Sequence, residues 1–284
     1  CADIQMENGN MGRNSCRLWK KIIYICKNKK RLMIKFDTFY YQCPRCKCWM
    51  EGHLLIASMI NQSILYSDGK ILNDGYITEH QKMIVCPACN HWSWVEKYEE
   101  PYISKTKPQE HFYTWNSWRF YGVHFGSNEG RMALVNHYKN FLSKSDYDRD
   151  QEIYFRRMMW WAYNDLIRNR YQINIERFTS KEMSFKVWWR NRKKLLQGID
   201  IFLQHHQDYV DNLSKLVELL KDRYTPDDEE YEATNLDIIE MYRQLGDFNN
   251  ANALLDKTTR RTYFISTIEK KVDEKDDLVF LVTG

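Results

Sequence analysis

The sequence lacks any apolar run long enough to cross a membrane. Its basic N-terminal stretch contains one apolar run, Ile22 to Cys26, which is too short for the hydrophobic region of a signal peptide and far too short to span a bilayer. We therefore expect a cytoplasmic protein without a membrane partner.

Catalytic signatures are also missing. The chain has no His-Glu-x-x-His motif, no phosphate-binding loop and no Gly-x-Ser-x-Gly motif. No nucleophile or paired carboxylate accompanies the histidines at a diagnostic spacing. Asp165 lies in an aromatic segment, where we expect a buried and hydrogen-bonded structural carboxylate. We therefore predict no catalytic residue and no bound organic cofactor, and the balance is against an enzyme.

Positive charge is not concentrated in one folded part of the chain. Residues 1–32 hold 8 Lys and Arg against 2 Asp and Glu, residues 33–107 hold 8 against 8, and residues 223–284 hold 8 against 14. A nucleic-acid-binding face needs concentrated positive charge to displace counterions from phosphates. We expect residues 1–32, which begin with Cys1 and not with Met, to be a basic tail that is disordered or foreign to the natural product.

Cysteine is the informative residue type. Four of the 8 cysteines form two Cys-Pro-x-Cys pairs, Cys43–Cys46 and Cys86–Cys89. Two such turns can close a tetrahedral shell of four thiolates around one zinc ion, which leaves no position for water or substrate. We therefore predict one structural zinc ion on Cys43, Cys46, Cys86 and Cys89. Cys48 and His91 are weaker candidates that would have to replace one of these ligands.

The stretch between the two cysteine pairs is rich in strand and turn signals. Residues 34–42 are rich in β-formers, and apolar runs on either side of Ser67-Asp68-Gly69 predict a hairpin because glycine tolerates the positive φ of the turn. Asp74-Gly75 predicts a second turn. We assign residues 33–100 to a zinc-ribbon domain and residues 101–127 to an aromatic connector.

The rest of the chain has helical periodicity. Phe202, Tyr209, Leu213, Leu216 and Leu220 recur at three- and four-residue spacing and predict one apolar helix face. We expect helices over about 128–143, 148–170, 181–196, 199–222, 229–245, 248–257 and 262–273. These helices would form one domain, residues 128–284, with a tetratricopeptide-like hairpin at 229–257. The fold class is α+β, mainly α.

Several motifs together resemble a family. The two Cys-Pro-x-Cys pairs, Tyr66-Ser67-Asp68-Gly69 between them, Trp160-Trp161-x-x-Asn164-Asp165 and Leu245-Gly246-Asp247-Phe248 are similar to those of a group of uncharacterised bacterial proteins. In that group a four-cysteine zinc ribbon precedes a tetratricopeptide-like helical region. The chain departs from the group at Asn90, where a glycine often follows the second pair, and in the extra Cys48. The resemblance implies an architecture and no activity.

These observations favour a non-enzymatic protein-interaction or scaffold module whose partner is a protein or peptide. The surplus of Trp and Tyr and the tetratricopeptide-like hairpin support this interpretation. Nucleic-acid binding is the alternative, because Trp49, Trp92 and Trp94 are able to stack on bases and Arg190 to Lys194 form a local basic cluster. An enzyme of unknown class is the second alternative.

Overall fold

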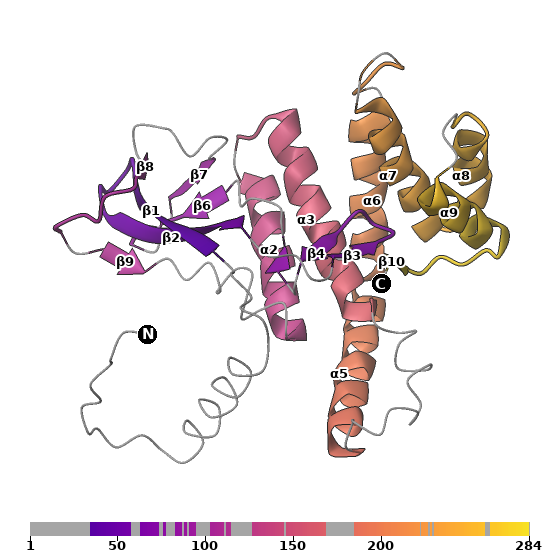
Figure 1. Ribbon diagram of the computed structural model, residues 1–284, viewed down its shortest axis with the longest axis horizontal. Coiled ribbons are helices and arrows are strands. Elements are labelled where there is room, and N and C mark those ends of the chain that lie inside the picture. The colour runs from indigo at the N-terminus through magenta and orange to yellow at the C-terminus, as the bar shows by residue number, and fades with distance from the viewer. Residues whose placement is uncertain are drawn as a thin grey trace.

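The computed structural model describes residues 35–57, 63–73, 76–77, 83–86, 88–89, 91–94, 103–110, 112–114, 127–144, 146–168, 185–221, 223–226, 228, 230–258 and 262–283. The predicted basic tail, the Asp74-Gly75 turn and most of the aromatic connector lie outside these residues. The protein is mainly helical and also contains small strands (Figure 1). Among the described residues, no helix combines the length and the apolar character that a membrane crossing requires.

The first cysteine pair lies in a sheet at one side of the molecule (Figure 1). Strands β1 (Lys35–Gln42) and β2 (Trp49–Ala57) form an antiparallel hairpin, with β8 (Ile103–Ser104) beside β1 and β9 (Phe112–Thr114) parallel to β2. The second cysteine pair lies on a separate two-stranded hairpin, β6 (Met83–Val85) and β7 (Trp92–Trp94).

The hairpin predicted around Ser67-Asp68-Gly69 is confirmed. It consists of β3 (Ser63–Tyr66) and β4 (Ile71–Asn73), and Gly69 in its turn has a φ of 74°, which glycine adopts without steric cost. Its neighbours are β5 (Tyr76–Ile77) and the C-terminal strand β10 (Leu281–Thr283), in the order β10-β3-β4-β5. A segment that lies between the two cysteine pairs in the sequence therefore pairs with the C-terminal strand.

The helices follow the predicted order with one displaced boundary. They are α2 (Asn128–Lys144), α3 (Arg149–Ile167), α5 (Phe185–Gln204), α6 (His206–Lys221), α7 (Tyr231–Gln244), α8 (Phe248–Leu255) and α9 (Tyr263–Asp273). The predicted break between residues 196 and 199 is wrong, because α5 continues through Gly198 and ends at Gln204. A Cβ on Gly198 would lie 2.4 Å from the carbonyl oxygen of Leu166, so this glycine permits a close helix crossing.

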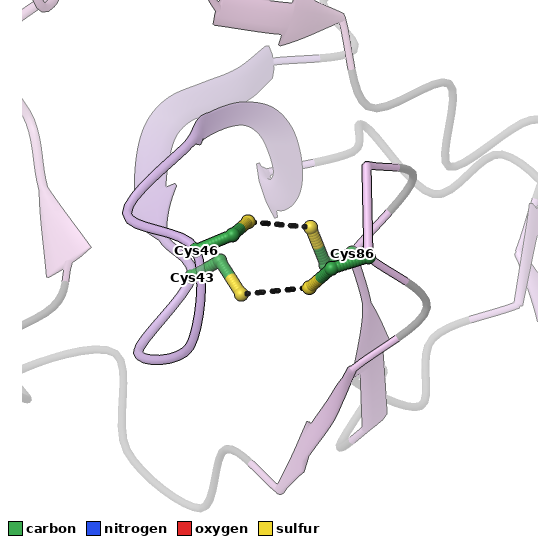
Figure 2. Close-up of side chains that lie close together, drawn as sticks. Cys43, Cys46 and Cys86 are labelled. Atoms are coloured by element: carbon green, nitrogen blue, oxygen red, sulfur yellow. Dashed lines mark hydrogen bonds between the residues drawn. The ribbon is translucent and has the colours of Figure 1, made fainter.

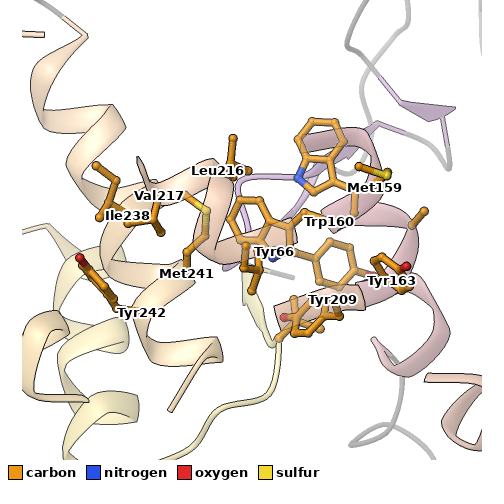
Figure 3. Close-up of a cluster of buried hydrophobic side chains, with 14 of the residues drawn as sticks. Tyr66, Met159, Trp160, Tyr163, Tyr209, Leu216, Val217, Ile238, Met241 and Tyr242 are labelled. Carbon is orange, nitrogen blue, oxygen red and sulfur yellow. The ribbon is translucent and has the colours of Figure 1, made fainter. Parts of the chain in front are cut away.

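The helices share one hydrophobic core. Trp160 from α3, Leu216 from α6 and Met241 from α7 are fully buried where the three helices meet (Figure 3). The predicted apolar face is confirmed for Tyr209, Leu213, Leu216 and Leu220, all of which are buried on α6. Phe202 belongs instead to α5, and its ring packs against Tyr209 with centroids 5.0 Å apart. Most of the large aromatic side chains in the described helices therefore pack in the core.

The segment predicted as a tetratricopeptide-like hairpin is helical on both sides of a turn. Gly246, with a φ of 74°, follows Leu245, the C-terminal cap of α7, and the Asp247 side chain accepts a hydrogen bond from the backbone N–H of Asn250 at the start of α8. Ala251 is fully buried between the helices. The domain boundaries at 33–100, 101–127 and 128–284 and the tetratricopeptide-like identity stay predictions.

Candidate metal centre

The four predicted cysteines lie together. Cys43 and Cys46 belong to the turn between β1 and β2, Cys86 and Cys89 belong to the turn between β6 and β7, and their Sγ atoms all lie within 4.8 Å of one another (Figure 2). The Sγ atoms are 3.7 Å apart in the Cys43–Cys89 pair and 3.5 Å apart in the Cys46–Cys86 pair. A tetrahedral thiolate shell with metal–sulfur bonds of about 2.3 Å has sulfurs about 3.8 Å apart. The cluster therefore fits a metal ion.

The two cysteine turns share one backbone hydrogen bond at corresponding positions. The N–H of Cys43 donates to the carbonyl oxygen of Cys48 at 2.9 Å, and the N–H of Cys86 donates to that of His91 at 2.8 Å, five residues later in both turns. Lys47 closes the first turn with a φ of 63°. Both turns thereby direct two sulfurs to one side, which explains why the same sequence motif occurs twice.

The electrostatics of the cluster favour a cation. The backbone N–H of Cys48 donates to the Cys46 sulfur and lowers the pKa of this thiol to about 6, whereas burial raises the pKa of the Cys86 thiol to about 12. Four adjacent thiolates repel one another, so their simultaneous ionisation requires a positive ion between them. Arg45 and Lys47 are exposed on the first turn and add positive charge nearby.

Cys48 lies beside the four-cysteine cluster. Its Sγ atom is 3.3 Å from that of Cys46 and 3.2 Å from that of Cys86. Among the described residues, the group of sulfurs with mutual distances that suit one ion contains Cys43, Cys46, Cys86 and Cys89 and leaves Cys48 out. Because Cys48 comes only two residues after the first pair, the sequence made it a weaker candidate for a ligand. Lys47, which has a positive φ, lies between Cys46 and Cys48 in the turn. Cys1, Cys16 and Cys26 lie outside the described residues.

The cluster joins two parts of the fold that pack against different neighbours. The β6–β7 hairpin packs on the helices, since Trp92 makes an edge contact with Phe141 of α2 and Trp94 makes one with Tyr154 of α3, with ring centroids 5.3 and 5.2 Å apart. The β1–β2 turn instead contributes to a second small core around Tyr41, Cys43, Met50 and Cys86. A metal ion would therefore link the β1–β2 sheet to a hairpin that is anchored on α2 and α3.

A buried ionic cluster holds the Ser67-Asp68-Gly69 turn on α3. The guanidinium of Arg168 donates to both carboxylate oxygens of Asp68 at 2.9 and 2.7 Å and to Asp165 at 2.7 Å. Lys70 donates to the other oxygen of Asp165 at 2.5 Å, and Asn164 donates to Asp68 at 2.8 Å. The side chains of the four charged residues are between 0% and 6% exposed, which makes this a structural cluster shielded from solvent.

The prediction that Asp165 is a buried, hydrogen-bonded carboxylate is confirmed. Burial opposes its ionisation, but the neighbouring Lys70 ammonium and Arg168 guanidinium lower the pKa of Asp165 to about 2. Burial lowers the pKa of Lys70 to about 8 even beside this carboxylate. Lys70 and Arg168 were not foreseen. The only local signal was Arg168 three residues after Asp165, a spacing at which helix side chains meet.

The polar contacts extend across the helical core. The Tyr209 hydroxyl of α6 lies 3.3 Å from Asn164 and donates to Gln244 of α7 at 2.5 Å. Gln244 donates to Glu240, whose two carboxylate oxygens also accept hydrogen bonds from Nε and Nη2 of the buried Arg243. Among the histidines, His205 lies 3.3 Å from the Asp208 carboxylate at the surface, and His111 and His124 lie outside the described residues.

Comparison of the chain with protein-family models, with curated proteins and with solved structures yields no match.

Proposed function

We propose that the protein is a non-enzymatic interaction module in which one structural zinc ion fastens a zinc ribbon to a helical, tetratricopeptide-like region. The single observation that carries this proposal is the group of four cysteine sulfurs within 4.8 Å of one another, supplied by two turns that share a corresponding backbone hydrogen bond. Four thiolates are the donor set of structural zinc sites. With all four positions filled by sulfur, such an ion offers none to a substrate.

The ion would act as a mechanical link. Zinc binding by four-ligand peptides is worth roughly 10 to 16 kcal/mol at neutral pH, which exceeds the stability that a few short strands gain from packing. Because Trp92 and Trp94 bring the β6–β7 hairpin onto α2 and α3, the ion would also hold the β1–β2 sheet at a fixed position on the helices. We infer a composite surface, made by the strands and the helices together, for a protein or peptide partner.

The charge of the C-terminal part favours a basic partner. Residues 223–284 hold 8 Lys and Arg against 14 Asp and Glu, and Asp256, Asp273, Glu274 and Asp277 are exposed. Lys257, Lys270 and Lys275 are exposed among these carboxylates, so the acidic excess is a net charge of the segment. A net negative charge steers positively charged partners and repels nucleic acid. A peptide with several Lys or Arg residues is therefore the ligand class that we propose for this region.

Nucleic-acid binding is the second candidate, supported by one helix. Trp189 of α5 is 57% exposed, and Arg192, Lys193 and Lys194 are exposed along the same helix. A ring beside cations is able to stack on a base and contact its phosphate. Three basic residues on one helix make a smaller basic face than nucleic-acid readers present, so this candidate ranks second.

The zinc proposal is tested by elemental analysis of the purified full chain. We expect one zinc per chain, lost in the Cys43→Ser/Cys86→Ser variant and retained in Cys48→Ser. The Cys48→Ser variant is the matched control, because its sulfur lies within 3.3 Å of two cluster sulfurs but outside the four-cysteine group. Wild-type protein without stoichiometric metal, or zinc loss from Cys48→Ser equal to that of the double variant, would contradict the assignment.

The interaction proposal is tested with the same preparation. Full-length protein is used to capture partners from its host extract, and labelled single-stranded RNA and duplex DNA are titrated in parallel at 50 and 200 mM salt. We expect a captured protein that the zinc-free variant no longer retains. Absence of a partner together with nucleic-acid affinity that falls steeply with salt would replace this proposal by the second candidate.

A further inference from the structure

Three large apolar side chains are exposed along α5. Trp189 is 57% exposed, Leu196 is 50% exposed and Leu203 is 64% exposed. Successive members are seven residues apart, so they lie on one face of the helix and form a line about 21 Å long at 1.5 Å per residue. We call these three residues the α5 stripe. An apolar line of this length on a solvent-exposed helix is typical of a protein-binding surface.

The stripe lies away from the side of α5 that packs on α3 and α6. On the side that faces α3, Gly198 is buried against Leu166 and the half-buried Phe202 packs on Tyr209. Leu196 is two residues before Gly198 on the helix, so it points about 160° away from that contact. Figure 1 shows α5 extending beyond the ends of the neighbouring helices, which leaves one end of this helix projecting from the body.

The charges beside the stripe are self-complementary. Lys193 and Asp200 are both exposed, and they lie on the same flank of the stripe, three residues before and four residues after Leu196. When two copies of α5 run antiparallel with Leu196 against Leu196, Lys193 of each copy faces Asp200 of the other. The same register places Trp189 against Leu203. In a parallel pair this flank of one copy would lie on the opposite side of the contact from the same flank of the other copy, so Lys193 and Asp200 would not meet. The charges therefore select the antiparallel arrangement.

We infer from this pattern that the occupant of the α5 stripe is a second copy of the chain. Two protomers pair through antiparallel α5 helices around a two-fold axis at Leu196, with two Trp189–Leu203 contacts and two Lys193–Asp200 ion pairs. Such an isologous contact closes on itself and forms a dimer without further growth. This inference goes beyond the proposed function, and its contacts use no residue of the metal centre.

Sedimentation velocity of the full chain tests the dimer. We expect a species of twice 34.5 kDa at micromolar concentration. Leu196→Glu removes the central contact and sets two carboxylates against each other, so it should sediment as a monomer with an unchanged circular dichroism spectrum. Tyr263→Glu is the matched control, because Tyr263 is 72% exposed on α9, away from the stripe, and this variant should remain dimeric.

A charge exchange tests the antiparallel register. Lys193→Asp alone and Asp200→Lys alone each create two like-charge contacts and should raise the dimer dissociation constant about tenfold. The double variant, Lys193→Asp with Asp200→Lys, restores both pairs and should return the constant to near the wild-type value. A wild-type monomer at 100 µM, or a double variant no tighter than the single ones, would overturn the inference. Dissociation of the wild-type dimer by RNA would overturn it in favour of a nucleic-acid surface on α5.

Discussion

At the scale of single residues, the least expected feature is a group of charges in the helical core. Asp68 is fully buried and receives two hydrogen bonds from Arg168, whose guanidinium also lies 4.2 Å from the ring centroid of Tyr66. The folded protein tolerates a buried charge only while its partner remains, because an isolated ion in the core has lost its hydration without compensation. Asp68 is thus the residue on which the docking of its hairpin depends.

Asp68→Asn is nearly isosteric and removes only the charge. It leaves the Arg168 guanidinium with a single carboxylate, Asp165, that is already shared with Lys70. We expect the free energy of unfolding to fall by about 3 kcal/mol, measured by urea denaturation at pH 7. Glu218→Gln is the control, because Glu218 forms an exposed ion pair with Lys215 and its loss should leave the urea midpoint unchanged. Equal midpoints for Asp68→Asn and wild type would show that the pair contributes nothing.

At the scale of elements, Gly198 shows how a local rule gives a wrong boundary. Glycine is a poor helix former and often follows a helix end, and the predicted break between residues 196 and 199 falls at this glycine. The structure instead uses the missing Cβ to bring α5 against the carbonyl of Leu166, 32 residues earlier in the chain. Nothing in the sequence around Gly198 indicates that Leu166 is its neighbour.

Gly198→Ala separates the effect of helix propensity from that of the close contact between α5 and Leu166. Helix propensity alone would stabilise the variant by about 1 kcal/mol, whereas the new Cβ would lie 2.4 Å from a backbone oxygen that cannot move freely. We expect a net loss of about 2 kcal/mol in urea denaturation, because overpacking of this size forces the two helices apart.

Gly246→Ala provides the comparison for this prediction. Gly246 has a φ of 74° and nothing lies within 4 Å of its added Cβ, so only backbone strain of about 1 kcal/mol is expected. Hydrogen exchange should quicken at the C-terminal end of α3 in Gly198→Ala and stay unchanged there in Gly246→Ala. A Gly198→Ala variant that is more stable than wild type would mean that the helices separate easily.

The elements and the site differ in how far the sequence predicts them. Helix periodicity, the Ser67-Asp68-Gly69 turn and the doubled cysteine motif are local patterns. They predicted the helices apart from the break at 196–199, the β3–β4 hairpin and the cysteine cluster. The contacts between Lys70 and Asp165 and between Asp68 and Arg168 span 95 and 100 residues, and no local pattern encodes them. Cys48, which the sequence made a weaker candidate for the same shell, lies beside Cys46 and Cys86 but outside the four-cysteine group.

At the scale of the whole molecule, the C-terminal segment is hydrogen-bonded to the Ser67-Asp68-Gly69 turn and to α7. The N–H of Ser67 donates to the carbonyl oxygen of Phe280 at 3.0 Å, and the N–H of Phe280 donates to the Ser67 hydroxyl at 3.1 Å. Arg243 of α7 donates to the carbonyl oxygen of Leu278 at 2.9 Å. The Ser67-Asp68-Gly69 turn is therefore fixed on one side by the C-terminal strand and on the other by α3, so disruption of the ionic cluster should affect the whole helical part.

The pH dependence of unfolding measures how strongly the ionic cluster stabilises the helical part. The pKa of Asp165 is about 2 in the folded protein, below the value near 4 expected in the unfolded chain. A carboxyl group with a depressed folded-state pKa stabilises the protein above its unfolded pKa, and this contribution disappears as the pH falls from about 4 to about 2. We therefore expect about 2 kcal/mol of the acid destabilisation to arise from Asp165.

The test compares urea midpoints of wild type and Asp165→Asn between pH 6 and pH 2. Other carboxyl groups titrate in the same range, and a zinc ion on four thiolates would dissociate as the sulfurs take up protons near pH 5. Both effects occur in wild type and variant alike, so the difference between the two curves isolates the Asp165 contribution. The variant should be less stable at pH 6 and should approach wild type as the pH falls towards 2. Parallel curves across the whole range would show that the buried charges do not link the hairpin, α3 and the C-terminal strand energetically.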